Sequence, residues 1–204
     1  MASPAKKSST NTLGHLSLGV GIGLLLLAGI IFIRLFHDSL RQEVRYAVTQ
    51  LQQPAALTPP NTDFAIVIDK IEAVAAIVKD IDPYNSQIYQ LALRDGVAHA
   101  RGTGVPGGGG NIFLFAHSSE DLLTAERYNS VFYLMHHLNG GDLIKVWYQK
   151  KEYHYLVKEK LSVSPTDTKY LTVKAPSEQL TLMTCWPPGT TLKRLIIVAE
   201  LVSS

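Results

Sequence analysis

From about Thr62 onward, the chain is a series of short runs rich in β-branched and aromatic residues, separated by turn-forming residues. The runs are FAIVID, AVAAIV, NIFLFAHS, DLIKVWYQ, EYHYLVKEKLSV, QLTLMTC and RLIIVAELV. Alternating apolar positions and β-branched side chains favour strands. Residues 84–96 and 127–138, which lie between these runs, have the composition of short helices. Seven or more strands with little helix predict a mostly β domain, either a closed barrel or a sandwich.

An apolar segment lies near the N-terminus, outside this β-rich region. Ser8 to Ile33 contain no Asp, Glu, Lys or Arg, and Leu16 to Phe36 form one largely apolar span. Its length suits a hydrocarbon core of about 30 Å, so we interpret it as a transmembrane helix. A cleaved signal peptide is the alternative. It is disfavoured because the apolar stretch is long and no small-x-small cleavage pattern follows it.

These features divide the chain into four segments. They are an N-terminal tail (1–15), a transmembrane helix (16–36), a stalk with a proline-rich linker (37–61) and a β domain (62–204). Of the 19 basic residues in the chain, Lys6, Lys7 and Arg34 precede residue 38, which leaves 16 against 17 acidic residues. This near-neutral charge gives no reason to expect a nucleic-acid partner.

Two patterns in the domain resemble ligand sites but lack the right context. Gly102–Gly107 (GTGVPG) matches the dinucleotide fingerprint, yet a helix-like segment precedes it and a strand follows, so we predict a connecting loop. His136 and His137 are adjacent and are expected to point in different directions. No Cys or acidic residue joins them at zinc-site spacing, so we predict no metal site and no cofactor. We expect four histidines to be surface or packing residues: His99, His136, His137 and His154.

Cys185 is the only cysteine in the chain, so it cannot form an intramolecular disulfide. It is either a small buried apolar residue or a reactive thiol. Its position favours the thiol, because it ends a strand just before the turn Pro187-Pro188-Gly189. The chain then returns through Arg194, and an antiparallel return would bring the guanidinium near the thiol. His117 ends another apolar strand, where it can reach a site at the rim of a barrel.

These three side-chain types suit one reaction. A thiolate is a nucleophile, an imidazole exchanges a proton, and a fixed cation stabilises the oxyanion that forms when a carbonyl is attacked. Together they predict acyl transfer through a thioester. Thr184, directly before the cysteine, is a candidate substrate-binding residue.

The same residues resemble the sortase family of membrane-anchored cysteine transpeptidases. TLMTC at 181–185 is similar to the T-L-x-T-C strand of that family, Arg194 to the arginine of the next strand, and His117 to the strand-end histidine. The similarity extends over FAIVIDKIEAVAAIV and GVAHARGTGVPGGGGN, and so over essentially all of residues 62–204. Ala116 and Ser118 flank His117 where many relatives have Gly and Arg. The short connection from Cys185 to Arg194 is closest to class D or E relatives.

The resemblance implies an eight-stranded barrel outside the cytoplasmic membrane, held by a single span, with the N-terminus inside. Cys185 would attack the carbonyl between Thr and Gly of an LPXTG-like sorting signal on a surface or pilin protein. His117 would protonate the leaving amine, and Arg194 would hold the oxyanion or the substrate. An amine from a cell-wall precursor or a pilin lysine, or water, would then release the acyl group. The alternative is a non-catalytic, membrane-tethered β-barrel that binds a partner.

Overall fold

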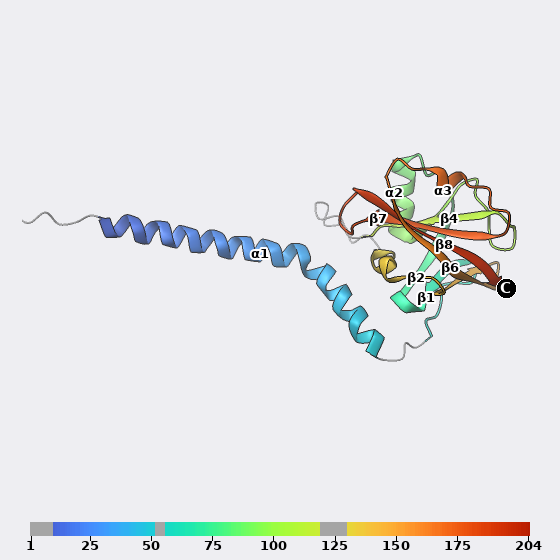
Figure 1. Cartoon of the computed structure of the whole chain (residues 1–204), viewed down its shortest axis with the longest axis horizontal. Coiled ribbons are helices and arrows are strands. Elements are labelled where there is room, and N and C mark those ends of the chain that lie inside the picture. Colours follow the sequence, from blue (N-terminus) through green and yellow to red (C-terminus); the bar gives the residue numbers. More distant parts are fainter. Residues whose placement is uncertain (1–9, 52–55, 119–129) are drawn as a thin grey trace, which may run out of the picture. The chain divides into compact units, whose positions relative to one another are not determined.

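The computed structural model describes residues 10–51, 56–118 and 130–204 of the chain (Figure 1). It separates into two compact units, Met1–Arg41 and Gln42–Ser204. The second unit contains all the strands of the described residues.

The first unit contains most of helix α1 (Thr10–Leu51), whose last turns belong to the second unit. Leucine, isoleucine and valine side chains described between Leu18 and Ile33 are exposed on this helix. Among the residues that the structure describes, no helix is long and apolar enough to cross a membrane. The transmembrane helix expected at residues 16–36 therefore stays a prediction.

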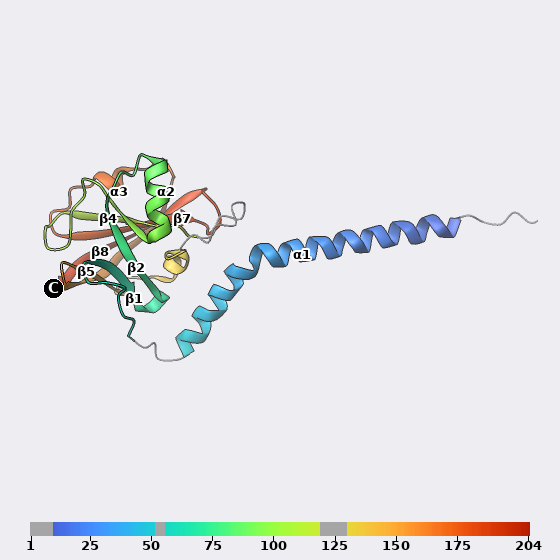
Figure 2. The ribbon, with the colours of Figure 1, turned by 180° about the vertical axis from the view of Figure 1, so that it is seen from behind.

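The second unit is a closed barrel of eight described strands, as predicted, with short helical segments between them (Figures 1 and 2). Around the barrel the strand order is β1-β2-β3-β4-β7-β8-β6-β5. Along the chain the elements are β1 (Phe64–Ile68), η1 (Asp69–Ile71), β2 (Ala73–Ile81), α2 (Ser86–Asp95), β3 (Val97–Ala100), β4 (Asn111–Phe115), η2 (Tyr133–His137), β5 (Leu143–Tyr148), β6 (Lys151–Val163), α3 (Lys169–Thr172), β7 (Gln179–Trp186) and β8 (Lys193–Ser203).

Two of the strand pairs are parallel, β2 with β3 and β4 with β7, and the other pairs are antiparallel. Parallel strands need a long crossover connection. Helix α2 lies in the first crossover, whereas β5 and β6 lie between β4 and β7 in the chain. The ends of β4 and β7 therefore meet at the same edge of the barrel.

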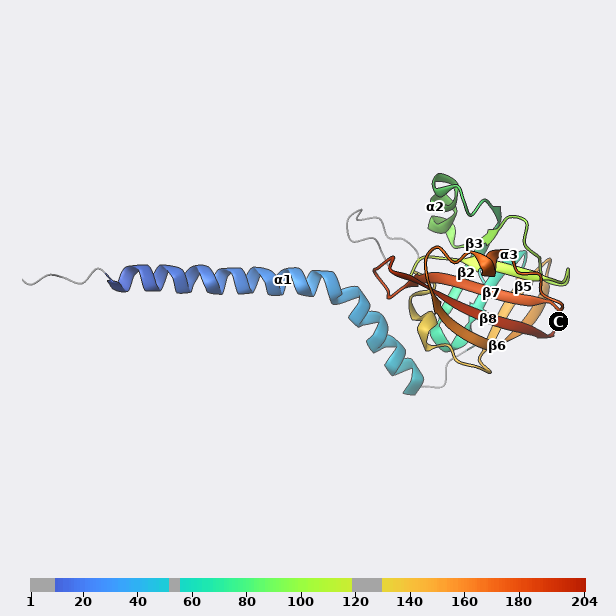
Figure 3. The same cartoon turned by 45° about the horizontal axis from the view of Figure 1, so that its top comes forward.

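Strand β4 is buried at every position, although successive side chains of a strand point to opposite faces. Its outer face must therefore be covered by other elements. The ring of Tyr89 in α2 packs edge-on against Phe115 at 6.0 Å between centroids. Asn111 donates its side-chain amide to the carbonyl of Tyr170 in α3 at 2.9 Å. Helices α2 and α3 thus cover the outside of the barrel near β4 (Figure 3).

The glycine-rich loop between β3 and β4 is held by one carboxylate. Glu178 accepts hydrogen bonds from the N–H groups of Gly107 (2.9 Å) and Gly109 (3.0 Å), and from the hydroxyl of Tyr155 (2.6 Å). Gly107 has φ of +78°, and a Cβ there would lie 2.6 Å from the hydroxyl of Tyr153, so this position requires glycine. These contacts fix the loop against the start of β7.

Two elements, β3 and η2, differ from the expectations. β3 was not predicted, because it has only four residues, all buried, and so shows no alternation. It comes directly before the loop that contains Gly102–Gly107, where a helix-like segment was expected; the connecting loop itself is confirmed. The helix expected at 127–138 is the 3₁₀ segment η2, and residues 127–129 lie outside the described residues.

His99 of β3 is a packing residue, in line with the expectation, and is fully buried. Its Nδ1 accepts the backbone N–H of Asp80 at 3.3 Å, and its Nε2 lies 2.9 Å from the carbonyl of Gly104, to which it donates. Both ring nitrogens are thus used by the neutral imidazole. Burial lowers the pKa of His99 below the ordinary value for histidine.

We predict that the domain loses stability as pH falls below about 6.5, the ordinary histidine pKa. Below that pH the unfolded chain takes up a proton at His99, whereas the folded chain resists it, so protonation favours unfolding. Urea unfolding of the wild type and of His99→Gln, at about pH 7.5 and about pH 5, measures the effect. The variant should lose less stability between the two pH values; an equal loss in both proteins would contradict the prediction.

Candidate active site

Two of the three predicted site residues face each other on neighbouring strands. Cys185 near the end of β7 is the register partner of Arg194 at the start of β8. Residues directly opposite in an antiparallel pair lie on the same face of the sheet. The structure therefore brings the thiol and the guanidinium to one face, as the antiparallel return predicted.

His117 reaches the same place through the parallel pairing of β4 with β7. Phe115 is the register partner of Met183, and the N–H of Ala116 donates to the carbonyl of Met183 at 3.2 Å. Continuing this register by two residues sets His117 at the level of Cys185. The histidine and the arginine thus lie on either side of the cysteine strand.

The alternation of side chains along β7 shows on which face of the barrel wall Cys185 and Arg194 lie. Leu180 and Leu182 belong to the barrel core, and Thr184 is buried in line with them. Cys185 therefore belongs to the opposite, outward face and is half-buried. A half-buried thiol on the outside of the barrel is accessible to a substrate that lies across the strand ends.

Thr184 makes a contact that bears on His117. Its hydroxyl donates to the backbone carbonyl of Ala116 at 2.9 Å, and the residue is buried. This bond extends the attachment of β4 to β7 beyond the last paired residues of β4. Thr184 thereby holds the segment that carries His117; its contact with substrate stays a prediction.

The two partners of Cys185 differ in their surroundings. His117 is half-buried, and its Nε2 atom is shielded from solvent. Arg194 is also half-buried, and its Nη1 donates to the carbonyls of Thr191 (3.3 Å) and Lys193 (3.1 Å). These bonds orient the guanidinium, which carries five N–H donors in total and can also donate to a substrate oxygen. The arrangement offers a nucleophile, a proton carrier and a cation at one edge.

Trp186 is a site neighbour that the sequence analysis did not single out. Its ring packs against His136 of η2, with 5.1 Å between centroids. The sequence signal that could have identified Trp186 is its position: it is an aromatic residue directly after the cysteine, where the strand meets a proline turn. This contact joins η2 to the strand that carries the nucleophile.

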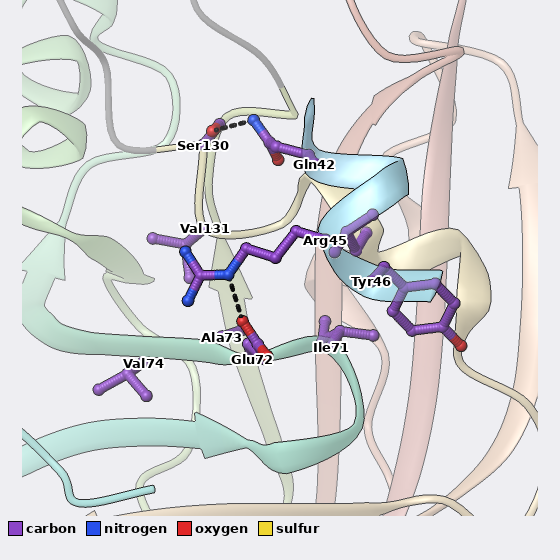
Figure 4. A pocket seen from close by; sticks show the side chains of 10 residues that line it. Gln42, Arg45, Tyr46, Ile71, Glu72, Ala73, Val74, Ser130 and Val131 are labelled. Carbon is purple, nitrogen blue, oxygen red and sulfur yellow. Dashed lines mark hydrogen bonds and ion pairs between the residues drawn. The ribbon is translucent and has the colours of Figure 1, made fainter. Parts of the chain in front are cut away.

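A separate cavity of about 290 Å³ lies within the second unit, where the last turns of α1 meet the barrel (Figure 4). Its lining includes neither Cys185 nor its two partners. The lining residues are Gln42, Arg45, Tyr46, Ile71, Glu72, Ala73, Val74, Ser130, Val131 and Leu134. Arg45 pairs with Glu72 at 2.7 Å, and Gln42 donates to Ser130 at 3.3 Å. These polar side chains thus bind one another across the cavity. The cavity therefore marks the contact between the last turns of α1 and the barrel.

The structure also brings Glu43 of α1 beside His136 and His137. No acidic residue lies at zinc-site spacing from the two histidines in the sequence, because Glu43 is far away along the chain. Only the packing of α1 on η2 makes it a neighbour. Burial, followed by the nearby His137, lowers the pKa of His136.

Comparisons with known proteins identify the family to which the chain is similar. Residues 66–202, more than half of the chain, match the family model described as "Sortase domain". None of the curated proteins compared with the chain matches it.

Solved structures give the same result. A lid mutant of sortase A from Corynebacterium diphtheriae is 27% identical (TM-score 0.56) and covers 71% of this chain and 72% of its own. Sortase C-1 from Actinomyces oris is 29% identical (TM-score 0.57; 71% and 75% covered). The sortase D5 transpeptidase from Clostridium perfringens is 23% identical (TM-score 0.55; 79% and 89% covered), which supports the fold alone.

Proposed function

Because the chain belongs to the sortase domain family, we propose that it cleaves an LPXTG-like sorting signal between Thr and Gly and transfers the acyl group to an amine. Membership of this family makes the chain a cysteine transpeptidase, and it has one cysteine. The observation that carries the assignment of residues is the strand register. It sets Cys185 opposite Arg194 and beside the segment that ends in His117.

The first half of the proposed reaction forms a thioester. The thiolate of Cys185 attacks the threonine carbonyl, so that a C–S bond forms and the carbonyl oxygen becomes an oxyanion. Arg194 donates hydrogen bonds to this oxyanion. The C–N bond to glycine then breaks, and His117 gives a proton to the leaving amine.

The second half releases the acyl group. An acceptor amine attacks the thioester, gives up a proton to His117 and forms a new amide, while the thiolate of Cys185 leaves. A cell-wall precursor or a pilin lysine supplies the amine, and water in its place gives hydrolysis. This scheme needs no group beyond the three side chains.

Surface or pilin proteins with a sorting signal are the proposed partners, and the proposed subclass is D- or E-like. The short connection between β7 and β8, from Pro187 to Leu192, supports this subclass. A non-catalytic binding module, the alternative from the sequence, does not account for three reactive side-chain types on one edge of the barrel.

We predict that Cys185→Ala abolishes formation of the thioacyl enzyme, since the change removes the nucleophile and few atoms. Mass spectrometry of the chain mixed with an LPXTG peptide should show a covalent adduct for the wild type only. The variant should keep the wild-type melting temperature. An adduct on the variant would exclude Cys185 as the nucleophile, and a wild type that forms none would contradict the proposed substrate.

We predict that Arg194→Lys lowers peptide turnover by about 10²–10³-fold, the usual effect of losing one oxyanion donor. Lysine keeps the charge but not the planar fork that directs several donors. Lys193→Ala is the matched control, because it removes an exposed neighbouring charge and should stay within about fivefold of the wild type. Arg194→Lys activity within the same range would remove Arg194 from the catalytic residues.

The proposed location is the cell membrane, with one span at residues 16–36 and the barrel outside the cytoplasm. The apolar composition of that segment supports it. We predict that the full chain remains with the membrane fraction after carbonate extraction, whereas residues 54–204 do not. External protease should cut the barrel of intact protoplasts. Release of the full chain by carbonate would contradict the anchor, and protection from protease would contradict the orientation.

A further inference from the structure

Three potential metal ligands converge where the end of α1 meets η2. The ligand atoms of Glu43, His136 and His137 all lie within 4.8 Å of one another. Nε2 of His137 is 3.0 Å from Oε2 of Glu43, and Nε2 of His136 is 3.4 Å from Oε1. Both imidazoles thus present the same ring nitrogen to one carboxylate.

The other contacts of the two rings fix this orientation. Nδ1 of His136 lies 3.2 Å from the carbonyl of Tyr133. The ring of His137 stacks on Tyr46 of α1, with 4.0 Å between centroids and 19° between planes. The two imidazoles lie 4.1 Å apart at 38°, because they follow each other at the end of a tight 3₁₀ segment. Adjacent histidines are therefore side by side here, contrary to the sequence expectation.

The proton balance of His136 points to a cation. A backbone carbonyl only accepts hydrogen bonds, so Nδ1 of His136 must carry the proton of a neutral ring. Its Nε2 then directs a lone pair at the carboxylate of Glu43, which also only accepts. This contact is favourable only when a proton or a metal ion lies between the two atoms. The imidazole of His137 alongside supplies a second nitrogen directed at the same carboxylate, so three ligand atoms are available to one metal ion.

We propose that Glu43, His136 and His137 bind one divalent first-row transition-metal ion. In a tetrahedral zinc site with bonds of about 2.1 Å, the ligand atoms are about 3.4 Å apart. The nitrogen–oxygen separations of 3.0 and 3.4 Å involve different oxygens of Glu43, and the ligand atoms of the three residues lie within 4.8 Å of one another, so small side-chain adjustments would bring them around one ion. A histidine that donates its other N–H to a backbone carbonyl is the usual arrangement around such ions.

The donor set also selects the class of ion. Two imidazole nitrogens and one carboxylate suit Zn²⁺, Ni²⁺ or Cu²⁺, whereas Ca²⁺ and Mg²⁺ prefer oxygen ligands. Three protein ligands leave a position for water or another small ligand. The ion would tie α1 to η2, which contacts Trp186 next to Cys185. Binding of this ion does not depend on the proposed substrate.

The test is titration of the full chain with Zn²⁺ by calorimetry, with any affinity tag removed. The chain carries Cys185→Ala, so that the thiol cannot act as a ligand. We expect one ion per chain, with a dissociation constant of about 10 µM or lower. Glu43→Gln and His137→Gln should each weaken binding by at least about tenfold, because even changes beyond the direct ligands cost about 10–100-fold.

Two matched controls separate metal binding from helix docking. Glu72→Gln weakens the contacts that Arg45 and Thr49 of α1 make with Glu72 but leaves the three ligands in place. His154→Gln removes a histidine that pairs with Glu152 at 2.8 Å and lies outside this cluster. Both controls should bind Zn²⁺ like the parent. Absence of saturable binding, or an equal loss in Glu72→Gln and Glu43→Gln, would overturn the proposal.

The emission of Trp186 provides a second readout that locates the ion. The chain has two tryptophans, so Trp147→Phe leaves Trp186 as the only one. Cu²⁺ quenches the emission of a nearby indole, and the Trp186 ring is 5.1 Å from that of His136. Saturable quenching in the Cys185→Ala chain, lost in His137→Gln, is the expected result. Quenching that survives His137→Gln would mean that the ion binds elsewhere.

Discussion

The parallel pairing of β4 with β7 is the contact on which the candidate site depends. Strands β5 and β6 separate β4 from β7 along the chain, so this is a long-range pairing. It sets Phe115 opposite Met183. Because the two strands run the same way, the segment after β4 and the end of β7 leave the barrel at one edge. The antiparallel neighbour β8 then adds Arg194 opposite Cys185. Three side chains from separate parts of the sequence meet because two strand registers are fixed.

Several contacts beyond the strand pairing itself support it. Tyr89 of α2 covers Phe115, and Asn111 at the start of β4 is bonded to Tyr170 of α3. Thr184 continues the attachment past the end of β4 through the carbonyl of Ala116. At the other end of the same strands, Glu178 holds the glycine-rich loop. The outer face of β4 is therefore covered and held by neighbouring elements, which keeps β4 in register with the strand that carries the nucleophile.

Segment η2 and the last turns of α1 meet close to the barrel edge that carries the nucleophile. His136 packs on Trp186 while facing Glu43 from the helix. The helix thus makes contact, through one imidazole, with the residue beside Cys185. A divalent ion at the three ligands would strengthen this connection by coordinate bonds, which are stronger and more directional than an exposed ion pair.

The sequence by itself determined the strands with clear alternation, the helix α2 and the three reactive side chains at strand ends, because propensity and side-chain period are local properties. Tertiary structure decided which strand ends meet, since pairing β4 with β7 depends on residues far apart in the chain. It also decided features with no local signal: the fully buried β3, the covered outer face of β4, and the approach of Glu43 to His136 and His137. Adjacent histidines were expected to diverge, but the tight turn of η2 and the stacked ring of Tyr46 hold them together.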